Sequence, residues 1–413
     1  MATETWRNWA RTQTARPVRI VHPRDVGEVS TAVKDAAADG LTVRPVGSGH
    51  CLTGLAVTDG VMLDLSALDR ARAVEPETGT VVVEAGIRLR RLWELLWRAG
   101  LEAESLGGMD QQSLGGALAT GEHGTGLRFG GIASQVRGLE LVLADGSVVT
   151  CSQQESPDLF QAARVGLGAF GVVTAVRLAC VPAGTVAVHH EQVELERFLD
   201  EADELIEAHD RLEYSWTPDR GRLVRTTVDR LPAGVPAPRR PRWRSILDAE
   251  SRPGASRRPT SSHSFTDRSY RVLGLRPGAA VREAEYAVPR ACFGAVFEEL
   301  RDRIEQIRPA VPVTVRLRFG AAEDAWLAMA QGRETCYLAA QAWRDQPYEA
   351  SFAMFESVAA RYDGRPHWGR LHGLQAATLR TRYPRFDDAR SVRDRVDPDR
   401  RFANLHLHRV LGE

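Results

Sequence analysis

The chain contains almost no lysine, few cysteines and no long apolar run. The last two shortages each argue against a class of protein. Lys34 is the single lysine among 54 basic residues, so arginine supplies nearly all of the positive charge. The five cysteines lie far apart without a Cys-x-x-Cys pair, which argues against a disulfide framework and a thiolate zinc site. No run of about 18 apolar residues occurs, and the N-terminus lacks the apolar core of a signal peptide. We therefore expect a cytoplasmic protein without a membrane partner.

An excess of charge of one sign is also missing. The 54 basic and 54 acidic side chains give zero net charge, which provides no electrostatic basis for binding nucleic acid. The composition, 413 residues with 43% hydrophobic and 26% charged, is typical of a soluble globular protein of two or three domains. Residues 236–262 are rich in Pro, Ser and Arg, and we predict a mobile, solvated insertion there. A nucleic-acid patch is the alternative, with Trp243 as its one aromatic able to stack on a base.

Hydrophobic periodicity indicates a change of organisation near residue 182. Before it, strands alternate with amphipathic helices, starting with a βαβ unit over residues 18–46 whose helix ends before Gly40. Further strands are predicted at 61–65, 81–84, 139–143, 148–151 and 172–178, with a helix at 89–96. After it, helices are predicted at 195–206 and 293–307 and strands at 313–319 and 337–343. The predicted domains are 1–182 and 183–365, followed by a C-terminal segment, 366–413.

The sequence Gly-Leu-Gly-Ala-Phe-Gly at residues 166–171 matches a dinucleotide-binding fingerprint in letters only. That fingerprint requires a strand before it and a helix after it, so that a helix N-terminus meets the pyrophosphate. Here residues 157–164 are predicted to be helical and the following segment, 172–178, to be a strand. Rossmann-type NAD binding is therefore disfavoured.

Two glycine clusters interrupt the otherwise apolar first domain. Residues 44–51 read RPVGSGHC, a glycine-rich turn that leaves a strand and ends in a histidine and a cysteine. Residues 113–126 contain five glycines and three hydroxyl residues, and we predict that they do not form a helix interior. One such cluster could be an ordinary surface loop. Two clusters favour a shared phosphate-bearing ligand, because glycines let backbone N–H groups converge on a phosphate and allow close approach to a flat ring.

In these motifs and several others the chain resembles the vanillyl-alcohol-oxidase-type flavoproteins with a PCMH-type FAD-binding domain. Within them it is most similar to the aldonolactone oxidases and the related alditol oxidases. The matching stretches include RPVGSGHCLTGLAVTDGVMLDLSAL, SLGGALATGEHGTG, EYAVPR, GRPHWGRLH and DPDRRFANLHLHRVLG. The resemblance implies an α+β fold: a two-part FAD-binding domain, formed by 1–182 and the C-terminal segment, and an α+β substrate-binding domain that caps the flavin.

The resemblance also implies which residues bind FAD. They are Pro45, Gly47, Ser48, Gly49, His50, Cys51, Ser113, Gly115, Gly116, Ala117, Thr120, Gly121, His123, Gly124, Gly126, Val172 and Val173. His50 occupies the position that is bonded covalently to the flavin 8α-methyl group, and neutral imidazole is a nucleophile near pH 7. A histidine hydrogen-bonded within a turn is the alternative for His50. Ala117 is the candidate residue beside flavin C4a, where its methyl group would either line or block a path for dioxygen. Glu122 replaces a threonine that the family usually has.

The candidate catalytic and substrate-binding residues lie on one predicted strand and in the C-terminal segment. Thr314, Arg316 and Arg318 alternate so that they share one strand face. The resemblance places Arg316 near the flavin N1–C2=O edge, with Thr314 where a glutamate is usual, and Arg370 in HWGR where a lysine is more common. The implied catalytic residues are Arg316, Arg370 and His367, and the implied substrate contacts are Thr314, Arg318 and His372.

Alternatives to these roles remain open. Arg370 is a fixed cation that cannot act as a base. Arg318 and Arg344 could instead be solvated on an exposed strand face, as arginine usually is. The histidine pairs at 189–190 and at 406 and 408 have no acidic neighbours at ligand spacing, so we expect no metal site.

The function implied by the resemblance is an FAD-dependent oxidoreductase. It would take hydride from a hydroxyl-bearing carbon of a small-molecule substrate, a sugar lactone such as D-arabinono-1,4-lactone or a polyol, and pass it to flavin N5. Dioxygen would reoxidise the flavin and give hydrogen peroxide. The first alternative is a natural-product tailoring oxidase acting on an aminosugar, an aglycone or an amine. The second, a flavin-free binding module using residues 236–262, is disfavoured by the zero net charge.

Overall fold

The fold begins with the predicted βαβ unit, which the computed structural model places in a three-stranded parallel sheet. The structure describes residues 4–218, 221–236, 262–274, 281–306, 313–343 and 346–413. Arg344 and residues 237–261 of the predicted insertion at 236–262 lie outside these described residues. The unit comprises β3 (Arg19–Val21), α1 (Val26–Ala38), β4 (Val43–Val46) and β5 (Val61–Asp64), with β5 between the other two strands. Asp25 caps α1 by accepting a hydrogen bond from the amide of Glu28, and Gly40 follows the helix in the left-handed conformation.

A five-stranded antiparallel sheet completes the first lobe. Its order is β10-β9-β11-β7-β6, and the strands are β6 (Ala71–Glu75), β7 (Thr80–Glu84), β9 (Val136–Val142), β10 (Val148–Cys151) and β11 (Val172–Ala179). The helices are α2 (Leu89–Arg98), α3 (Leu114–Thr120) and α4 (Pro157–Ala163). Short strands β1 (Trp6–Arg7), β2 (Thr14–Ala15), β8 (Leu101–Glu102) and β12 (Val181–Pro182) lie at its margins. The segment 166–171 lies between α4 and β11, which confirms the order that argued against a Rossmann fingerprint.

Helix α3 corrects one sequence expectation. The prediction that the second glycine cluster forms no helix interior is wrong, because α3 runs through Gly115 and Gly116. Leu114 and Leu118 are buried in the core of the lobe, so packing offsets the poor helix propensity of glycine. A β-carbon on Gly115 would lie 3.0 Å from that of Ala85, so glycine lets the helix approach the strand end closely. Gly121 ends the helix with a positive φ of 72°.

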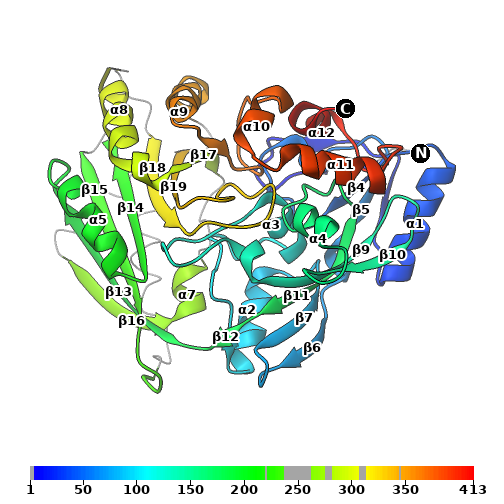
Figure 1. Cartoon of the computed structure of the whole chain (residues 1–413), viewed down its shortest axis with the longest axis horizontal. Coiled ribbons are helices and arrows are strands. Elements are labelled where there is room, and N and C mark those ends of the chain that lie inside the picture. Colours follow the sequence, from blue (N-terminus) through cyan, green and yellow to red (C-terminus); the bar gives the residue numbers. More distant parts are fainter. Residues whose placement is uncertain (1–3, 219–220, 237–261, 275–280, 307–312, 344–345) are drawn as a thin grey trace.

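An eight-stranded antiparallel sheet forms the second lobe (Figure 1). Its order is β16-β13-β15-β14-β18-β19-β17-β20. The strands are β13 (Thr185–Val193), β14 (Arg211–Thr217), β15 (Arg222–Arg230), β16 (His263–Arg268), β17 (Val281–Pro289), β18 (Val313–Gly320), β19 (Thr335–Trp343) and β20 (Arg365–Pro366). Helices α5 (Phe198–Ala208), α8 (Phe293–Gln306) and α9 (Glu349–Arg361) pack their apolar residues on one face. The other face, with the short helix α7 (Ser269–Leu273), is turned toward the first lobe.

The C-terminal segment returns to the first lobe, as the resemblance implies. Helices α10 (Ala376–Arg382), α11 (Phe386–Val396) and α12 (Leu405–Leu411), in orange and red in Figure 1, contribute to the core of that lobe. The amide of Val43 donates to the carbonyl of Arg401, and the side-chain amide of Asn404 donates to the carbonyls of Gly54, Leu55 and Val57. Of the described helices, none is long and apolar enough to cross a membrane. The domain limits at 182 and 365 stay a prediction.

Candidate active site

A large cavity opens where the two glycine clusters meet. We call it the glycine-lined cavity; it lies between the turn after β4, helix α3, the loop 166–171 and the C-terminal segment. The predicted cofactor residues that line it are Pro45, Gly47, Ser48, Gly49, His50, Cys51, Ser113, Gly115, Gly116, Thr120 and Val173. Arg370, from the C-terminal segment, lines it as well.

The walls of the cavity depend on glycine. A β-carbon on Gly47 would lie 1.8 Å from Oγ of Ser113, so the first cluster touches the second where a side chain would collide. Gly49 has a positive φ of 66° and lies against the ring of Trp6. Such backbone, without side chains, leaves N–H groups uncovered toward a ligand, which is the form of a pyrophosphate cradle. The residues present therefore fit a dinucleotide.

Other predicted cofactor residues do not line this cavity. Ala117 is fully buried within α3, and Gly121 forms its C-terminal cap. Gly126 pairs with Gly320 of β18, and Val172 is buried in the core of the parallel sheet. Gly124 lines a different cavity, described below, and His123 joins a buried charge cluster.

His50 lies in the wall of the glycine-lined cavity. Its side chain is 7% exposed, and its ring stacks on Trp9 with the centroids 4.9 Å apart. Burial, with smaller contributions from the positive charges of Arg370 and Arg88, lowers the pKa of His50 to about 4. The imidazole is therefore neutral at pH 7, and its Nδ1 has no hydrogen-bond partner among the described residues.

Sequence reasoning missed a third wall of the cavity. The loop 166–171, dismissed as a Rossmann fingerprint, contributes Gly166, Leu167, Gly168, Phe170 and Gly171 to the lining. Buried Arg44 fixes this loop by donating to the carbonyls of Leu167 and Gly168. The high glycine content of this loop was the signal in the sequence that could have placed it in the ligand site.

A second cavity lies between the large sheet and the first lobe. We call it the arginine-lined cavity. Its lining is Leu106, Gly108, Gly124, Thr125, Val188, His190, Arg211, Glu213, Thr226, Val228, Phe265, Val272, Leu273, Arg316 and Arg318. Thr314 is not part of this lining. His372 lies against Trp368 and His406, and it lines neither cavity.

Arg318 corrects the expectation of a solvated strand face. Arg318 is only 4% exposed, and its guanidinium donates to Oε1 of Glu285 at 2.5 Å. Alternation along β18 sends Val315 and Leu317 into the core and turns Arg316 and Arg318 toward the first lobe, as predicted. Arg316 forms a two-pronged ion pair with Glu213 of β14, with N–O distances of 2.6 to 3.0 Å.

Three carboxylates that sequence reasoning did not assign to the site surround Arg370. Nε of Arg370 lies 3.1 Å from Glu283 and 4.0 Å from Glu285, and Nη2 lies 3.7 Å from Glu122. Burial alone would raise the pKa of Glu285, but the charges of Arg318 and His123 hold it well below its usual value. Burial opposes ionisation of Glu122 in the same way, and Arg370 keeps its pKa low. Glu122 and Glu285 are therefore ionised, and they help to fix the guanidinium groups of Arg318 and Arg370.

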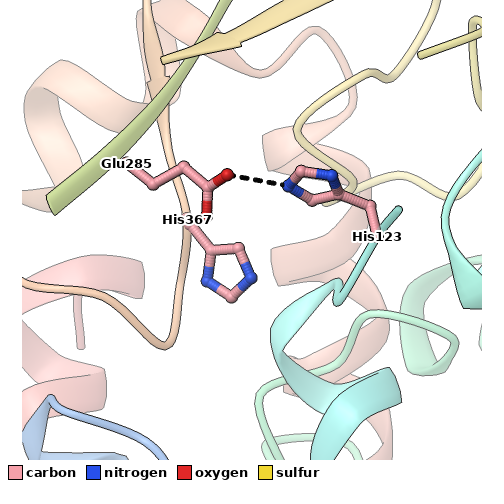
Figure 2. Close-up of side chains that lie close together, drawn as sticks. All are labelled: His123, Glu285 and His367. Atoms are coloured by element: carbon pink, nitrogen blue, oxygen red, sulfur yellow. Dashed lines mark ion pairs between the residues drawn. The ribbon is translucent and has the colours of Figure 1, made fainter. Parts of the chain in front are cut away.

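The two buried histidines of the cluster, His123 and His367, have different neighbours. Nδ1 of His123 lies 3.0 Å from the carbonyl oxygen of Gly124, and its Nε2 lies 3.1 Å from Oε1 of Glu285 (Figure 2). Nδ1 of His367 accepts a hydrogen bond from the amide of Gly369, and burial lowers the pKa of His367 to about 3. His367 is therefore neutral, with its proton on Nε2.

His123, Glu285 and His367 are also spaced like metal ligands, which the sequence did not predict. Their ligand atoms lie within 4.8 Å of one another. Figure 2 shows the three side chains grouped together. Arg318 already donates to the same carboxylate oxygen that faces His123, and Arg370 borders the group. A divalent cation there would be repelled by two guanidinium groups. The arrangement is that of a buried ion-pair network.

Comparison with known proteins identifies the family. L-gulono-1,4-lactone dehydrogenase of Mycobacterium tuberculosis (strain ATCC 25618 / H37Rv) is 36% identical over 98% of this chain and 99% of its own length. The chain belongs to the aldonolactone oxidase and dehydrogenase family of FAD-dependent enzymes. Family profiles described as D-arabinono-1,4-lactone oxidase and FAD binding domain match residues 249–410 and 17–152.

Two further relatives agree with the resemblance seen in the sequence, and one solved structure agrees with the fold. Alditol oxidase of Streptomyces sp. is 31% identical, and L-gulonolactone oxidase of Mus musculus is 27% identical, each over 98% of both chains. Among solved structures, cholesterol oxidase from B. sterolicum superposes with a TM-score of 0.82 over 99% of this chain and 97% of that chain. Its 16% identity makes this a likeness of fold alone. The predicted α+β FAD-binding fold is confirmed.

Proposed function

We propose that the protein oxidises a hydroxyl-bearing carbon of a sugar lactone or polyol, with dioxygen as the electron acceptor. One observation carries the proposal: two fixed cations, one in each cavity, are held by the same buried cluster. Arg370 lines the glycine-lined cavity that fits FAD, and Arg318 lines the neighbouring arginine-lined cavity. Both approach Glu285, within 2.5 and 4.0 Å. A substrate in the second cavity would therefore meet the cofactor beside preorganised positive charge.

The chemistry follows from the cofactor and from fixed protein charges. Bound FAD would supply a hydride acceptor at N5, and dioxygen would take the two electrons with two protons to give hydrogen peroxide. The substrate carbon loses a hydride and its oxygen loses a proton, so an alcohol becomes a carbonyl. Arg318 and Arg370 would orient the oxygen and stabilise its negative charge, but neither can accept the proton. Arg316, paired with Glu213, offers a donor and an acceptor to further hydroxyl groups.

Anaerobic mixing tests the proposed reaction. L-Gulono-1,4-lactone, D-arabinono-1,4-lactone or xylitol should bleach the flavin absorbance of the holoenzyme, and air should then restore it within seconds with stoichiometric peroxide. Reoxidation over many minutes would make the enzyme a dehydrogenase. No bleaching by any lactone or polyol would contradict the proposed substrate class.

Arginine substitutions test the assigned roles. Arg370→Ala and Arg318→Ala should each slow flavin reduction by about 10²-fold, because each removes a charge held against the reacting oxygen. Arg380→Ala is the control, since Arg380 is exposed and pairs with Asp387 on the surface. Stopped-flow absorbance measures the rates, and thermal melts show whether the variants remain folded. Unchanged rates in both site variants would place the reaction elsewhere.

The proposal includes covalent attachment of FAD through His50 and a reducing, cytoplasmic compartment. The neutral, partly unpartnered imidazole supports the linkage, and five free cysteines support the compartment. Acid precipitation should leave the yellow colour in the protein pellet, and the intact mass should exceed that of the polypeptide by one FAD. His50→Ala should release the flavin to the supernatant. A bare polypeptide mass for flavin-replete enzyme would contradict the linkage.

A further inference from the structure

The arginine-lined cavity is polar at one end and apolar at the other. The order of strands in the large sheet separates the two ends, because β16, β13 and β15 lie on one side and β14 and β18 on the other. Glu213, Arg316 and Arg318 come from β14 and β18. Val188, Val228 and Phe265 come from the opposite side of the sheet. The polarity of the cavity therefore changes along its length.

The polar end lies next to the site already described. Arg318 contacts the carbonyl of His123 and the carboxylate of Glu285, and Arg316 and Glu213 form their ion pair beside it. Burial alone would raise the pKa of Glu213, but Arg316 keeps it low, so the pair is fully charged. Hydroxyl groups can donate to this carboxylate and accept from these guanidinium groups.

The apolar end offers a hydroxyl group almost nothing. Val272 and Leu273 of α7 close it from above the sheet and pack against Val188, Val228 and Phe265. Three polar side chains border this end, and each already has a partner. His190 and Thr226 bond each other at 2.7 Å. Arg211, opposite Val228 on β14, donates to the carbonyl of Glu104 and lies over the ring of Phe129. A sugar hydroxyl placed among these side chains would lose its hydrogen bonds to water without replacement.

The two ends of the cavity suit different parts of a ligand. A five- or six-carbon polyol would satisfy its hydroxyl groups only at the polar end. The apolar end fits a group of the opposite character.

We propose that the substrate is amphipathic: a hydroxylated head that is oxidised at the polar end, joined to an alkyl or aryl substituent that occupies the apolar end. The oxidation of the head rests on the proposed function. The binding of an apolar substituent rests only on the lining of the cavity. It can therefore be measured without turnover.

A graded series of 1-O-alkylglycerols tests the inference, because each member adds apolar length to the same diol head. Isothermal titration of the holoenzyme with glycerol and its ethyl, butyl and hexyl ethers, below micellar concentrations, gives the affinities. We expect about a fourfold gain for each buried methylene until the apolar end is filled. Equal affinities across the series would overturn the inference.

Amino-acid substitutions show whether the gain in affinity with tail length arises at the apolar end of the cavity. Leu273→Asn should flatten the dependence on tail length, because it places an amide at the apolar end. Leu205→Asn is the matched control: it also replaces a partly buried leucine, but on α5, which packs on the opposite face of the sheet. Val272→Thr, which keeps the side-chain volume, repeats the test in case Leu273→Asn does not fold. A dependence unchanged in both α7 variants would overturn the inference.

The two proposals fail in different ways. If lactones reduce the flavin but longer tails give no gain in affinity, the amphipathic substrate is wrong and the proposed function stands. If affinity rises with tail length and is lost in the α7 variants, while no lactone or polyol reduces the flavin, the proposed function is wrong and the apolar subsite stands. Glu213→Gln should weaken every member of the series by the same factor, because it acts on the head alone.

Discussion

At the scale of single residues, Glu285 holds more of the site than any residue that the sequence singled out. It binds Arg318 at 2.5 Å, and its Oε1 lies 3.1 Å from Nε2 of His123. In Glu285→Gln a neutral amide replaces the carboxylate, so Arg318 should lose the charged partner that fixes its position. Stopped-flow absorbance should show flavin reduction slowed by about tenfold or more.

Glu323→Gln is the control for that experiment. Its carboxyl group is also buried near His123 but bonds Ser134, and burial raises its pKa. This variant should keep the rate of flavin reduction. An unchanged rate in Glu285→Gln as well would contradict the role assigned to the Glu285 carboxylate.

Gly47 provides a second residue-scale prediction. Gly47→Ala should abolish FAD binding, because the new methyl group would lie 1.8 Å from Oγ of Ser113 and would force the two glycine clusters apart. The ratio of flavin absorbance to protein absorbance measures the loss. Gly294→Ala in α8, where a β-carbon meets nothing within 4 Å, should keep full flavin content and gain about 0.5–1 kcal/mol of stability. Full flavin content in Gly47→Ala would show that the clusters can separate without loss.

At the scale of elements, strand β19 determines whether the ion pair can form. Glu285 and Arg318 belong to β17 and β18, which flank β19, and Ala339 lies opposite Glu285 on the intervening strand. The small side chain of Ala339 leaves room for Arg318 to reach across. Ala339→Leu should break the contact, cost about 1–3 kcal/mol by overpacking, and slow flavin reduction. Ala339→Gly should keep the reaction rate, and equal rates for both variants would contradict this view of β19.

The same strands show what the sequence could and could not predict. The period-two pattern in β18 correctly put Arg316 and Arg318 on one face, because alternation is a local property. Their partners Glu213 and Glu285 are about 100 and 30 residues away, respectively, and only the strand order brings them together. The glycine clusters were recognised as a ligand site from composition. Helix α3 was missed because buried leucines outweighed the propensity of the glycines between them.

At the scale of the whole molecule, buried neutral histidines make stability depend on pH. Burial lowers the pKa of His367 and His406 to about 3, and that of His372 well below its usual value. The unfolded chain binds these protons near pH 6.5, so below that pH it holds more protons than the folded chain and the free energy of unfolding falls. Each histidine should contribute about 1.4 kcal/mol per pH unit between pH 6.5 and its own lowered pKa.

Urea midpoints at pH 7.5, 6.5 and 5.5 measure this slope. The midpoint should be constant above pH 7 and should fall steadily toward pH 5.5. The buried carboxylates of Glu122, Glu213 and Glu285, whose pKa values are lowered, contribute stability that is lost only below about pH 4.5, so these three do not enter this window. His406→Gln should make the slope shallower. A midpoint that stays level down to pH 5.5 would contradict the neutral state of these rings.

The contact between the start and the end of the described chain sets an order of events during synthesis. Arg44 donates to the carbonyl of Phe402, which is made 358 residues later, and the same guanidinium fixes the loop beside the glycine-lined cavity. At about 5–20 residues per second, the ribosome needs on the order of tens of seconds to bring the two together. Before Gly369 and Arg370 are made, the nascent first lobe also lacks the C-terminal wall of its cavity. We therefore expect flavin to be bound only after the C-terminal segment has joined the first lobe.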